Sequence, residues 1–303
     1  MPLAITTPTG HIGSALVRHL LDAGRTDLVL LVRDASKLPA DVRERVETRE
    51  GVLEDAAYVQ AATAGADALF WLSPNDWTAP DLFASYRARA ALVAGAVSAN
   101  GIGHVVHLSS EGAQNRTDHG PVSGLGIIEE ALDVIAAEIG AAVRHLRPTF
   151  FYENFEAQLG AIAGMGAVFF PVPPATTTGM IATRDIAAKA ADLLLDLSWT
   201  GTGVVVLHGP AHLSYAEAAR ILTDGLGRPV AAQQVPREAL VGQFVSMGAS
   251  PDYAAGLVTL YEAIGRDTYS IDPRTPDTAT PTTLDAYVAD TLRPMLDAMP
   301  PTA

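Results

Sequence analysis

Short, continuous runs of apolar residues recur along the first half of the chain, and helical spacing of apolar residues follows most of them. A run of four or five apolar residues predicts a strand buried on both faces, as in a parallel sheet covered by its crossover helices. The predicted strands are 3–6, 28–32, 46–51, 68–72, 105–108 and 142–146. The predicted helices are 14–24, 56–64, 81–100 and 127–139. Five or six βα units in succession predict an α/β fold with a doubly wound parallel sheet.

The turn between the first predicted strand and helix is rich in small residues and reads Thr7-Pro8-Thr9-Gly10-His11-Ile12-Gly13. Such a turn presents free backbone N–H groups at a helix N-terminus, where hydrogen bonds and the helix dipole bind phosphate. Gly10 and Gly13 would let the backbone approach a pyrophosphate and let the helix pack closely on the strand. Thr7 stands where the dinucleotide fingerprint has its first glycine, so an ordinary tight turn is the alternative.

The second predicted strand ends in Arg33-Asp34, about twenty residues past the glycines. In a dinucleotide-binding βαβ unit this position meets the adenosine ribose. An acidic residue there selects NAD, whereas an arginine can pair with the 2′-phosphate of NADP. Because Arg33 comes first, the sequence favours NADP(H), with NAD(H) as the alternative.

From residue 149 the regular alternation of apolar runs and helical patterns ends. Residues 150–155 are densely aromatic in a chain with only 6% aromatic residues. Further strands are predicted at 179–182 and 204–208, and helices at 184–197 and 214–226. Thr183 and Ser214 are their expected N-caps, with Glu217 as the capping-box partner of Ser214. We therefore expect a dinucleotide-binding core over 1–150. Residues 151–303 would form a smaller α+β substrate region, with some elements returning to the core in one integrated unit.

Composition narrows the classes of partner. The formal net charge of -14 argues against nucleic acid, which needs clustered Lys and Arg. No apolar run approaches the roughly eighteen residues of a membrane span, and the N-terminus enters a strand at once, so a cytoplasmic protein without a signal peptide is expected. The chain has no cysteine, which removes thiol chemistry, and no metal site is predicted. The sequence leaves open whether the protein forms a homo-oligomer.

Gly120-Pro121-Val122-Ser123-Gly124 matches the G-x-S-x-G nucleophile elbow of acyl hydrolases. That elbow requires a strand immediately before the serine. The segment 113–126 is polar and glycine-rich and is predicted to be a loop, so an acyl hydrolase is disfavoured.

Several segments together resemble one family. They are the glycine turn, Leu30-Leu31-Val32-Arg33-Asp34, Phe70-Trp71-Leu72-Ser73-Pro74, Val106-His107-Leu108-Ser109-Ser110, and Leu146 to Asn154. In this order and spacing, up to about Tyr269, the chain resembles the NmrA-like atypical short-chain dehydrogenase/reductases. The resemblance implies a Rossmann core that binds NAD(P) under a smaller C-terminal region. The family includes NADPH-dependent quinone reductases, tailoring proteins of aromatic polyketide pathways, and redox-sensing regulators that bind the cofactor without turnover.

The resemblance also assigns site residues by position. It implies a pyrophosphate site formed by Thr7, Gly10, His11, Ile12 and Gly13. It implies that Arg33 reads the 2′-phosphate, that Ser73 and Pro74 pass beside the adenine-side ribose, and that Ser109 and Pro148 border the nicotinamide. The expected substrate wall is Phe150, Phe151, Tyr152, Glu153 and Asn154, with Trp71 and Trp77 opposite. Two departures are Thr7 for the first glycine and Gly51-Val52-Leu53 for a Gly-Asp-Leu that would place a carboxylate near the adenine.

Many enzymes of the superfamily use a Tyr-x-x-x-Lys pair, in which the lysine lowers the tyrosine pKa. The only lysines are Lys37 and Lys189, and neither follows a tyrosine by four residues, so an alcohol/ketone dehydrogenase is disfavoured. Hydride delivery to a quinone is less demanding, because the developing oxyanion is delocalised and positioning supplies most of the catalysis.

Candidate proton donors are Tyr152, His11 and Ser109. His107 is interpreted as a core histidine, and the carboxylates Glu111, Glu153 and Asp76 as solvated or capping groups. The predicted function is an NADP(H)-dependent oxidoreductase acting on a quinone-like or polycyclic aromatic molecule, in a biosynthetic tailoring step. The alternatives are an NAD(P)-sensing regulatory protein and a non-reductive pathway enzyme on the same fold.

Overall fold

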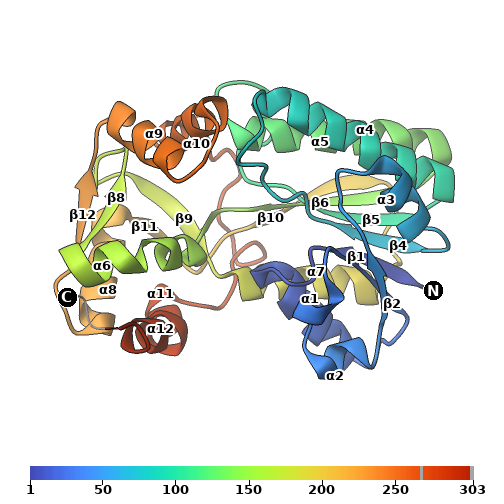
Figure 1. The fold of residues 1–303 in the computed structure, drawn as a ribbon, viewed down its shortest axis with the longest axis horizontal. Coiled ribbons are helices and arrows are strands. Elements are labelled where there is room, and N and C mark those ends of the chain that lie inside the picture. The colour runs from blue at the N-terminus through green and yellow to red at the C-terminus, as the bar shows by residue number, and fades with distance from the viewer. Residues whose placement is uncertain (267–268, 301–303) are drawn as a thin grey trace.

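A computed structural model describes residues 1–266 and 269–300. Its centre is a seven-stranded sheet in the order β10-β6-β5-β4-β1-β2-β3, and every neighbouring pair is parallel (Figure 1). The strands are β1 (Leu3–Thr6), β2 (Leu28–Val32), β3 (Glu47–Glu50), β4 (Ala68–Trp71), β5 (His104–Leu108), β6 (Ala142–Pro148) and β10 (Thr202–Leu207). The order runs outward in both directions from β1 and β4, which confirms the doubly wound Rossmann-like fold.

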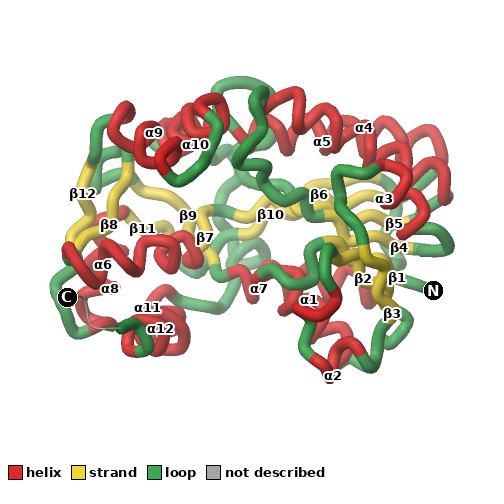
Figure 2. Tube along the Cα trace, in the orientation of Figure 1, coloured by secondary structure: helices red, strands yellow, loops and turns green. Residues whose placement is uncertain are grey.

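Helices cover both faces of this sheet (Figures 1 and 2). On one face lie α1 (His11–Asp22) and α7 (Thr183–Leu195), with η1 (Ala35–Lys37) and α2 (Ala40–Arg43) at its edge. On the other lie α3 (Ala56–Ala62), α4 (Leu82–Asn100) and α5 (Pro121–Ile139). Strands β1, β2 and β4 are buried along their whole length, because both faces are covered.

The C-terminal region has its own apolar core, built on two small sheets. Its strands are β7 (Phe150–Phe151), β8 (Ala167–Phe170), β9 (Thr177–Ile181), β11 (His212–Ser214) and β12 (Ala231–Gln234). Its helices are η2 (Tyr152–Gln158), α6 (Leu159–Met165), α8 (Tyr215–Leu226), α9 (Arg237–Ser246), α10 (Pro251–Ile264), α11 (Leu284–Tyr287), η3 (Val288–Leu292) and α12 (Arg293–Asp297). Between them the chain returns to the main sheet, since α7 packs on α1 and β10 pairs with β6.

The predicted loop over 113–126 is wrong in its second half, because α5 begins at Pro121. Proline suits the first helical position, where its missing N–H costs nothing. The small residues that suggest a loop serve close packing: a Cβ on Gly124 would lie 2.3 Å from the Tyr86 ring. Ser123 is fully buried in the helix, accepts a hydrogen bond from the His119 N–H and donates to the Asn115 carbonyl. It therefore has no nucleophile elbow around it.

Several other strand and helix ends differ from the predictions by one to three residues, and two of these differences change the role of a named residue. Strand β6 continues through Pro148, which pairs with Leu207, and the next N–H, that of Thr149, donates to the Leu207 carbonyl. Helix α7 starts one residue earlier than expected, so Thr183 is its first residue and not its N-cap. Ser214 and Glu217 form the predicted capping box of α8.

Candidate functional site

Two cavities meet at the carboxyl edge of the main sheet, where ligands lie in open α/β folds. The larger has a volume of about 720 Å³ and the smaller about 300 Å³. Both are lined by Ile12, Leu72, Pro74, Asn75, Phe151 and Asn154. Molecules bound in the two cavities would therefore share a wall.

The turn after β1 forms the floor of the larger cavity, which Thr7, Thr9, Gly10, His11 and Ile12 line. Gly13 lies behind this turn. A Cβ there would come within 2.1 Å of the Thr7 carbonyl oxygen, whereas a Cβ on Gly10 would stay 3.7 Å from it. The two predicted glycines thus differ: Gly13 allows close packing of α1 on the turn, and Gly10 leaves its space to the cavity.

Thr7 has a left-handed backbone, with φ of 51°. A β-branched residue rarely adopts this conformation, which glycine adopts without cost. The turn therefore keeps the geometry of a fingerprint glycine although the residue is a threonine. The Thr7 hydroxyl oxygen is buried without a hydrogen-bond partner among the described residues.

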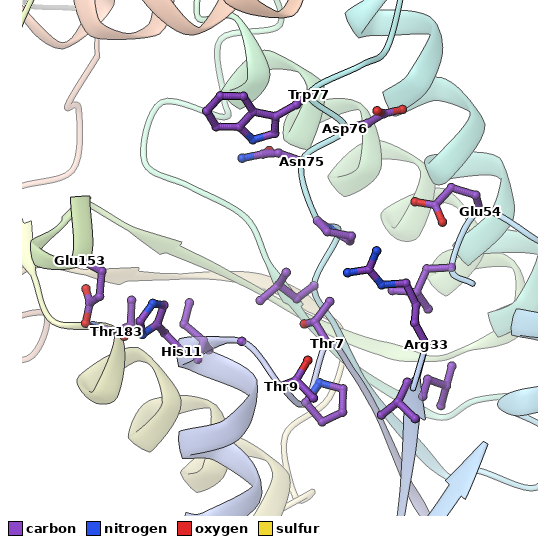
Figure 3. A pocket seen from close by; sticks show the side chains of 18 of the residues that line it. Thr7, Thr9, His11, Arg33, Glu54, Asn75, Asp76, Trp77, Glu153 and Thr183 are labelled. Carbon is purple, nitrogen blue, oxygen red and sulfur yellow. Dashed lines mark hydrogen bonds between the residues drawn. The ribbon is translucent and has the colours of Figure 1, made fainter. Parts of the chain in front are cut away.

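Arg33 and Asp34, at the end of β2, point to different surroundings. Arg33 lines the larger cavity, is exposed, and has no hydrogen bond or ion pair within the described part of the chain (Figure 3). Asp34 instead caps η1 by accepting hydrogen bonds from the Ser36 N–H at 2.9 Å and the Ser36 hydroxyl at 2.6 Å. These bonds lower the pKa of Asp34. The acidic group is committed to the turn, and the arginine faces the cavity.

Glu54 is a cavity residue that the sequence reasoning missed. It lines the larger cavity on the same side as Arg33 (Figure 3), and its Oε1 lies 3.6 Å from Nη2 of Arg89. It follows directly on the segment 51–53, where the missing carboxylate was noted. Its position, directly after Leu53, is the signal in the sequence that indicates a carboxylate at this end of the cavity.

His11, Glu153 and Thr183 lie together at the opposite end of the larger cavity (Figure 3). Oε1 of Glu153 accepts hydrogen bonds from the N–H and the hydroxyl of Thr183, at 3.0 and 2.6 Å. Glu153 therefore caps the start of α7, which is one of the two roles expected for it from the sequence. Its other oxygen is buried without a partner, and burial raises the pKa of Glu153. The His11 Nε2 is 3.5 Å from Oε2 of Glu156.

The smaller cavity is apolar and aromatic. Among the predicted residues, Ser73, Ser109 and Phe150 line it, and Phe151 and Asn154 line both cavities. Tyr86 of α4, Tyr261 of α10 and Tyr269 complete its wall, and the sequence reasoning missed all three. In the sequence, a tyrosine on the apolar face of a helix looks like an ordinary core residue. Only the packing of α4 and α10 in the folded protein shows that Tyr86 and Tyr261 line a cavity.

Ser109 is held by a buried ion pair. Its hydroxyl donates to Oε1 of Glu129 at 2.6 Å, and Arg147 donates to both oxygens of that carboxylate, at 2.9 and 2.6 Å. Burial alone would raise the pKa of Glu129, but the hydrogen bonds from Arg147 and Ser109 outweigh it and lower the pKa to about 2. Since Glu129 is ionised, the Ser109 hydrogen is committed to it, which corrects the candidacy of Ser109 as a proton donor.

Besides Gly13, three predicted site residues line neither cavity. Tyr152 is 1% exposed, and its hydroxyl donates to the Thr282 carbonyl at 3.2 Å, so the structure corrects its expected role as a proton donor and pocket wall. Trp71 is also 1% exposed and lies in the sheet, where its Nε1–H donates to the Ser73 hydroxyl oxygen. Pro148 is buried at the end of β6. Trp77 does line the larger cavity and stacks on Tyr253.

The remaining titratable candidates separate by burial. His107 is fully buried with Nδ1 at 3.1 Å from Nδ1 of His145, and burial lowers its pKa to about 3, as for a core histidine. Glu111 is 2% exposed, which corrects its interpretation as solvated, and burial raises its pKa to about 7. Asp76 lines the larger cavity and accepts a hydrogen bond from the Thr78 N–H.

A doubly wound parallel sheet whose first strand leads through a tight, small-residue turn into a helix defines the general class of Rossmann-fold proteins. Within that class, the model of the NmrA-like family matches residues 2–288. The chain therefore belongs to the NmrA-like family.

Three similar proteins span nearly the same length. The NAD(P)H azoreductase of Xenophilus azovorans is 32% identical over 275 residues, which cover 85% of this chain and 91% of that protein. A Staphylococcus aureus structure described as a nucleoside-diphosphate-sugar epimerase has a TM-score of 0.81 at 18% identity, covering 96% of this chain and all of that one. The NADPH complex of an Escherichia coli NADPH-dependent quinone oxidoreductase has a TM-score of 0.76 at 21% identity, covering 96% and 99%. The two solved structures share the fold with this chain.

Over residues 1–266 and 269–300, no helix is both long and apolar enough to cross a membrane. In the same residues, no group of His, Asp and Glu side chains is arranged to hold a metal ion.

Proposed function

We propose that the protein is an NADPH-dependent reductase, with the cofactor in the larger cavity and an aromatic acceptor in the smaller one. The observation that carries the proposal is the wall that the two cavities share, at Pro74, Asn75, Phe151 and Asn154. These residues would hold the nicotinamide end of a bound cofactor beside a flat molecule in the smaller cavity, and hydride transfer requires donor and acceptor sites that adjoin in this way. When bound, the cofactor supplies the hydride.

The residues of the larger cavity fit an NADP molecule. The first residues of α1, His11, Ile12 and Gly13, would present backbone N–H groups to a pyrophosphate, while the Gly10 N–H is used within the turn by the Thr7 carbonyl. Arg33 is available for a 2′-phosphate, while Asp34, which would select NAD, is committed to Ser36. The name of the azoreductase relative includes NAD(P)H, and the quinone oxidoreductase structure holds NADPH, which supports the same assignment.

An aromatic acceptor fits the smaller cavity because Phe150, Phe151 and Tyr261 line it. The names of two relatives, an azoreductase and a quinone oxidoreductase, support this substrate class. Hydride transfer to such an acceptor needs no Tyr–Lys pair, because the negative charge spreads over the ring system. Burial raises the pKa of Tyr261 to about 12, so its hydroxyl stays protonated and can donate a hydrogen bond to the reduced oxygen. A cytoplasmic location, a homo-oligomer and a role in aromatic polyketide tailoring stay predictions.

A second function, cofactor sensing without turnover, is favoured by one observation. The Ser109 hydrogen is committed to Glu129, and no carboxyl or imidazole group lines the smaller cavity among the described residues. An acceptor there would depend on neutral donors or water for its proton.

The test is a titration of the purified protein with NADPH and NADH, followed by mixing the NADPH complex with a panel of quinones. We expect NADPH to bind at least about tenfold more tightly than NADH, a preference worth roughly 1.4 kcal/mol, and quinone to oxidise it. Arg33→Gln should remove the preference, while Arg220→Gln, an equal charge change at an exposed position, should keep it. Binding without oxidation would favour the sensor, and no binding of either nucleotide would refute the proposal.

A further inference from the structure

We propose that the smaller cavity selects its acceptor by charge: it binds flat aromatic molecules that are uncharged and rejects sulfonated or carboxylated ones. This inference rests on the proposed function for turnover, but the selection itself is a property of binding. It would separate this chain from reductases whose acceptors are anionic dyes.

No ionisable Lys, Arg, His, Asp or Glu is among the described residues that line the smaller cavity. The polar residues of its wall are all neutral side chains, namely Ser73, Asn75, Tyr86, Ser109, Ser110, Thr149, Asn154, Tyr261 and Tyr269. The other lining residues are apolar. An anion placed here would lose its hydration and gain no countercharge.

The nearest cations cannot substitute for a charged lining residue. Behind Ser109, Arg147 is engaged with both oxygens of Glu129. Arg116 donates to the Ala113 carbonyl and lies 3.6 Å from the same Glu129 carboxylate. Recruiting Arg147 to a ligand would leave the buried carboxylate of Glu129, a residue 1% exposed, without its main partner, and Arg116 does not line the cavity.

The protein as a whole carries net negative charge. The chain carries 34 acidic and 20 basic residues, for a net charge of -14. Asp76 follows Asn75 and lines the adjoining larger cavity. A dye with a sulfonate would therefore meet repulsion on approach as well as a desolvation cost on entry.

The hydrogen-bonding groups of the wall suit neutral carbonyl oxygens. The Ser73 oxygen accepts from Trp71, so its own hydrogen is available, and the Asn75 Oδ1 accepts from Tyr86, so its amide N–H groups are available. These donors, with the Tyr261 hydroxyl, match an acceptor that has oxygens and no donors of its own. A volume of about 300 Å³ lies at the lower end of the range for small-molecule sites, which favours a compact ring system.

The test uses two matched pairs that differ only by a sulfonate: 1-phenylazo-2-naphthol with its 4′-sulfonate, and 1,2-naphthoquinone with its 4-sulfonate. Binding to the NADPH-saturated protein is followed after rapid mixing by the fast quenching of tryptophan and tyrosine fluorescence that precedes oxidation, and turnover is followed by nicotinamide absorbance. We expect the neutral member of each pair to bind about 100-fold more tightly, as an unpaired buried charge implies. Equal affinities within a pair, or no binding of either neutral compound, would overturn the inference. Selective binding without oxidation would leave the inference standing and refute the reductase.

A second experiment introduces a positive charge into the wall of the smaller cavity. Leu257 lines the smaller cavity and is partly buried, so Leu257→Lys can place an ammonium group at the wall while its stem covers the same surface. The variant should tighten binding of the sulfonates about tenfold and narrow the ratio between members of a pair, whereas Leu257→Met should keep the wild-type ratio. Leu125→Lys, from α5, repeats the test if Leu257→Lys does not fold. An unchanged ratio in a folded lysine variant would contradict selection by charge.

Discussion

At the residue scale, the turn after β1 shows how one backbone geometry can be reached by different residues. Thr7 adopts the left-handed conformation of a fingerprint glycine, with φ of 51°. The neighbouring glycines matter because they have no side chain. At Gly13 this lets the helix approach the Thr7 carbonyl, and at Gly10 it leaves space in the cavity. The sequence predicted the turn and its glycines, but a residue type alone does not report a φ angle.

The two glycines should respond differently to an added methyl group. In Gly13→Ala the Cβ would lie 2.1 Å from backbone, so α1 must shift, and we expect destabilisation of roughly 2–4 kcal/mol as for overpacking. Gly10→Ala meets only an ordinary contact at 3.7 Å and should fold normally, yet bind NADPH about tenfold more weakly. Urea unfolding and nucleotide titration measure the two effects. Equal stability losses would contradict the assignment.

At the element scale, Ser109, Glu129 and Arg147 join the ends of β5 and β6 to the middle of α5. The sequence could predict strands β5 and β6, because their apolar runs are continuous. It could not predict this junction, because Glu129 lies in the predicted helix 127–139 but nothing local indicates which side chain of that helix meets the ends of β5 and β6. Trp71 was misassigned for a related reason: in a central strand both faces are covered, so alternation gives no sign of which side chains reach a cavity.

Removing the charge of Glu129 should destabilise the junction. Glu129→Gln leaves the buried guanidinium of Arg147 without its countercharge, and we expect a loss of about 3 kcal/mol in the free energy of unfolding. Asp133→Asn, one helical turn further along α5 and half exposed, pairs only with His145 and should cost under about 1 kcal/mol. Denaturant unfolding of both variants measures the difference. Similar losses would mean that the ion pair does not stabilise the junction.

At the scale of the whole molecule, the Rossmann core was predictable from strand pattern and spacing, whereas the smaller cavity was not. Its wall draws on β5, α4, α5 and α10, which are far apart in the sequence. The local sequence does not indicate which distant elements pack against one another. The same long-range packing buries Glu111 and gives the protein a pH-dependent stability that no local pattern indicates.

Burial raises the pKa of Glu111 from 4.5 to about 7. The folded state therefore binds the proton more tightly than the unfolded state, so the stability from this group is full below pH 4.5 and is lost as pH rises toward 7. Glu111→Gln should stabilise the protein by up to about 3 kcal/mol at pH 8 and change little at pH 4.5. Exposed Glu44→Gln is the control for unfolding curves at both pH values. A gain at pH 8 no larger than the control's would contradict this account.

His107 contributes the opposite slope. Because burial lowers its pKa from 6.5 to about 3, the unfolded state binds the proton first. Its contribution to stability is full above pH 6.5 and is lost as pH falls toward 3. We therefore expect the wild-type unfolding free energy to decline on the acid side, and His107→Gln, though less stable at neutral pH, to decline less steeply. Parallel acid limbs in the two proteins would rule out this role for His107.

The most direct measurement of the central claim is a single-turnover reaction, in which the NADPH complex is mixed rapidly with excess 1,2-naphthoquinone and the nicotinamide absorbance is followed. If the cofactor and acceptor occupy the two adjoining cavities, the absorbance should decay in one exponential phase whose rate saturates with quinone. Leu257→Trp, which fills the smaller cavity, should abolish that phase while NADPH still binds. A stable NADPH complex whose absorbance does not change with any neutral quinone would contradict the reductase and favour a protein that senses the cofactor.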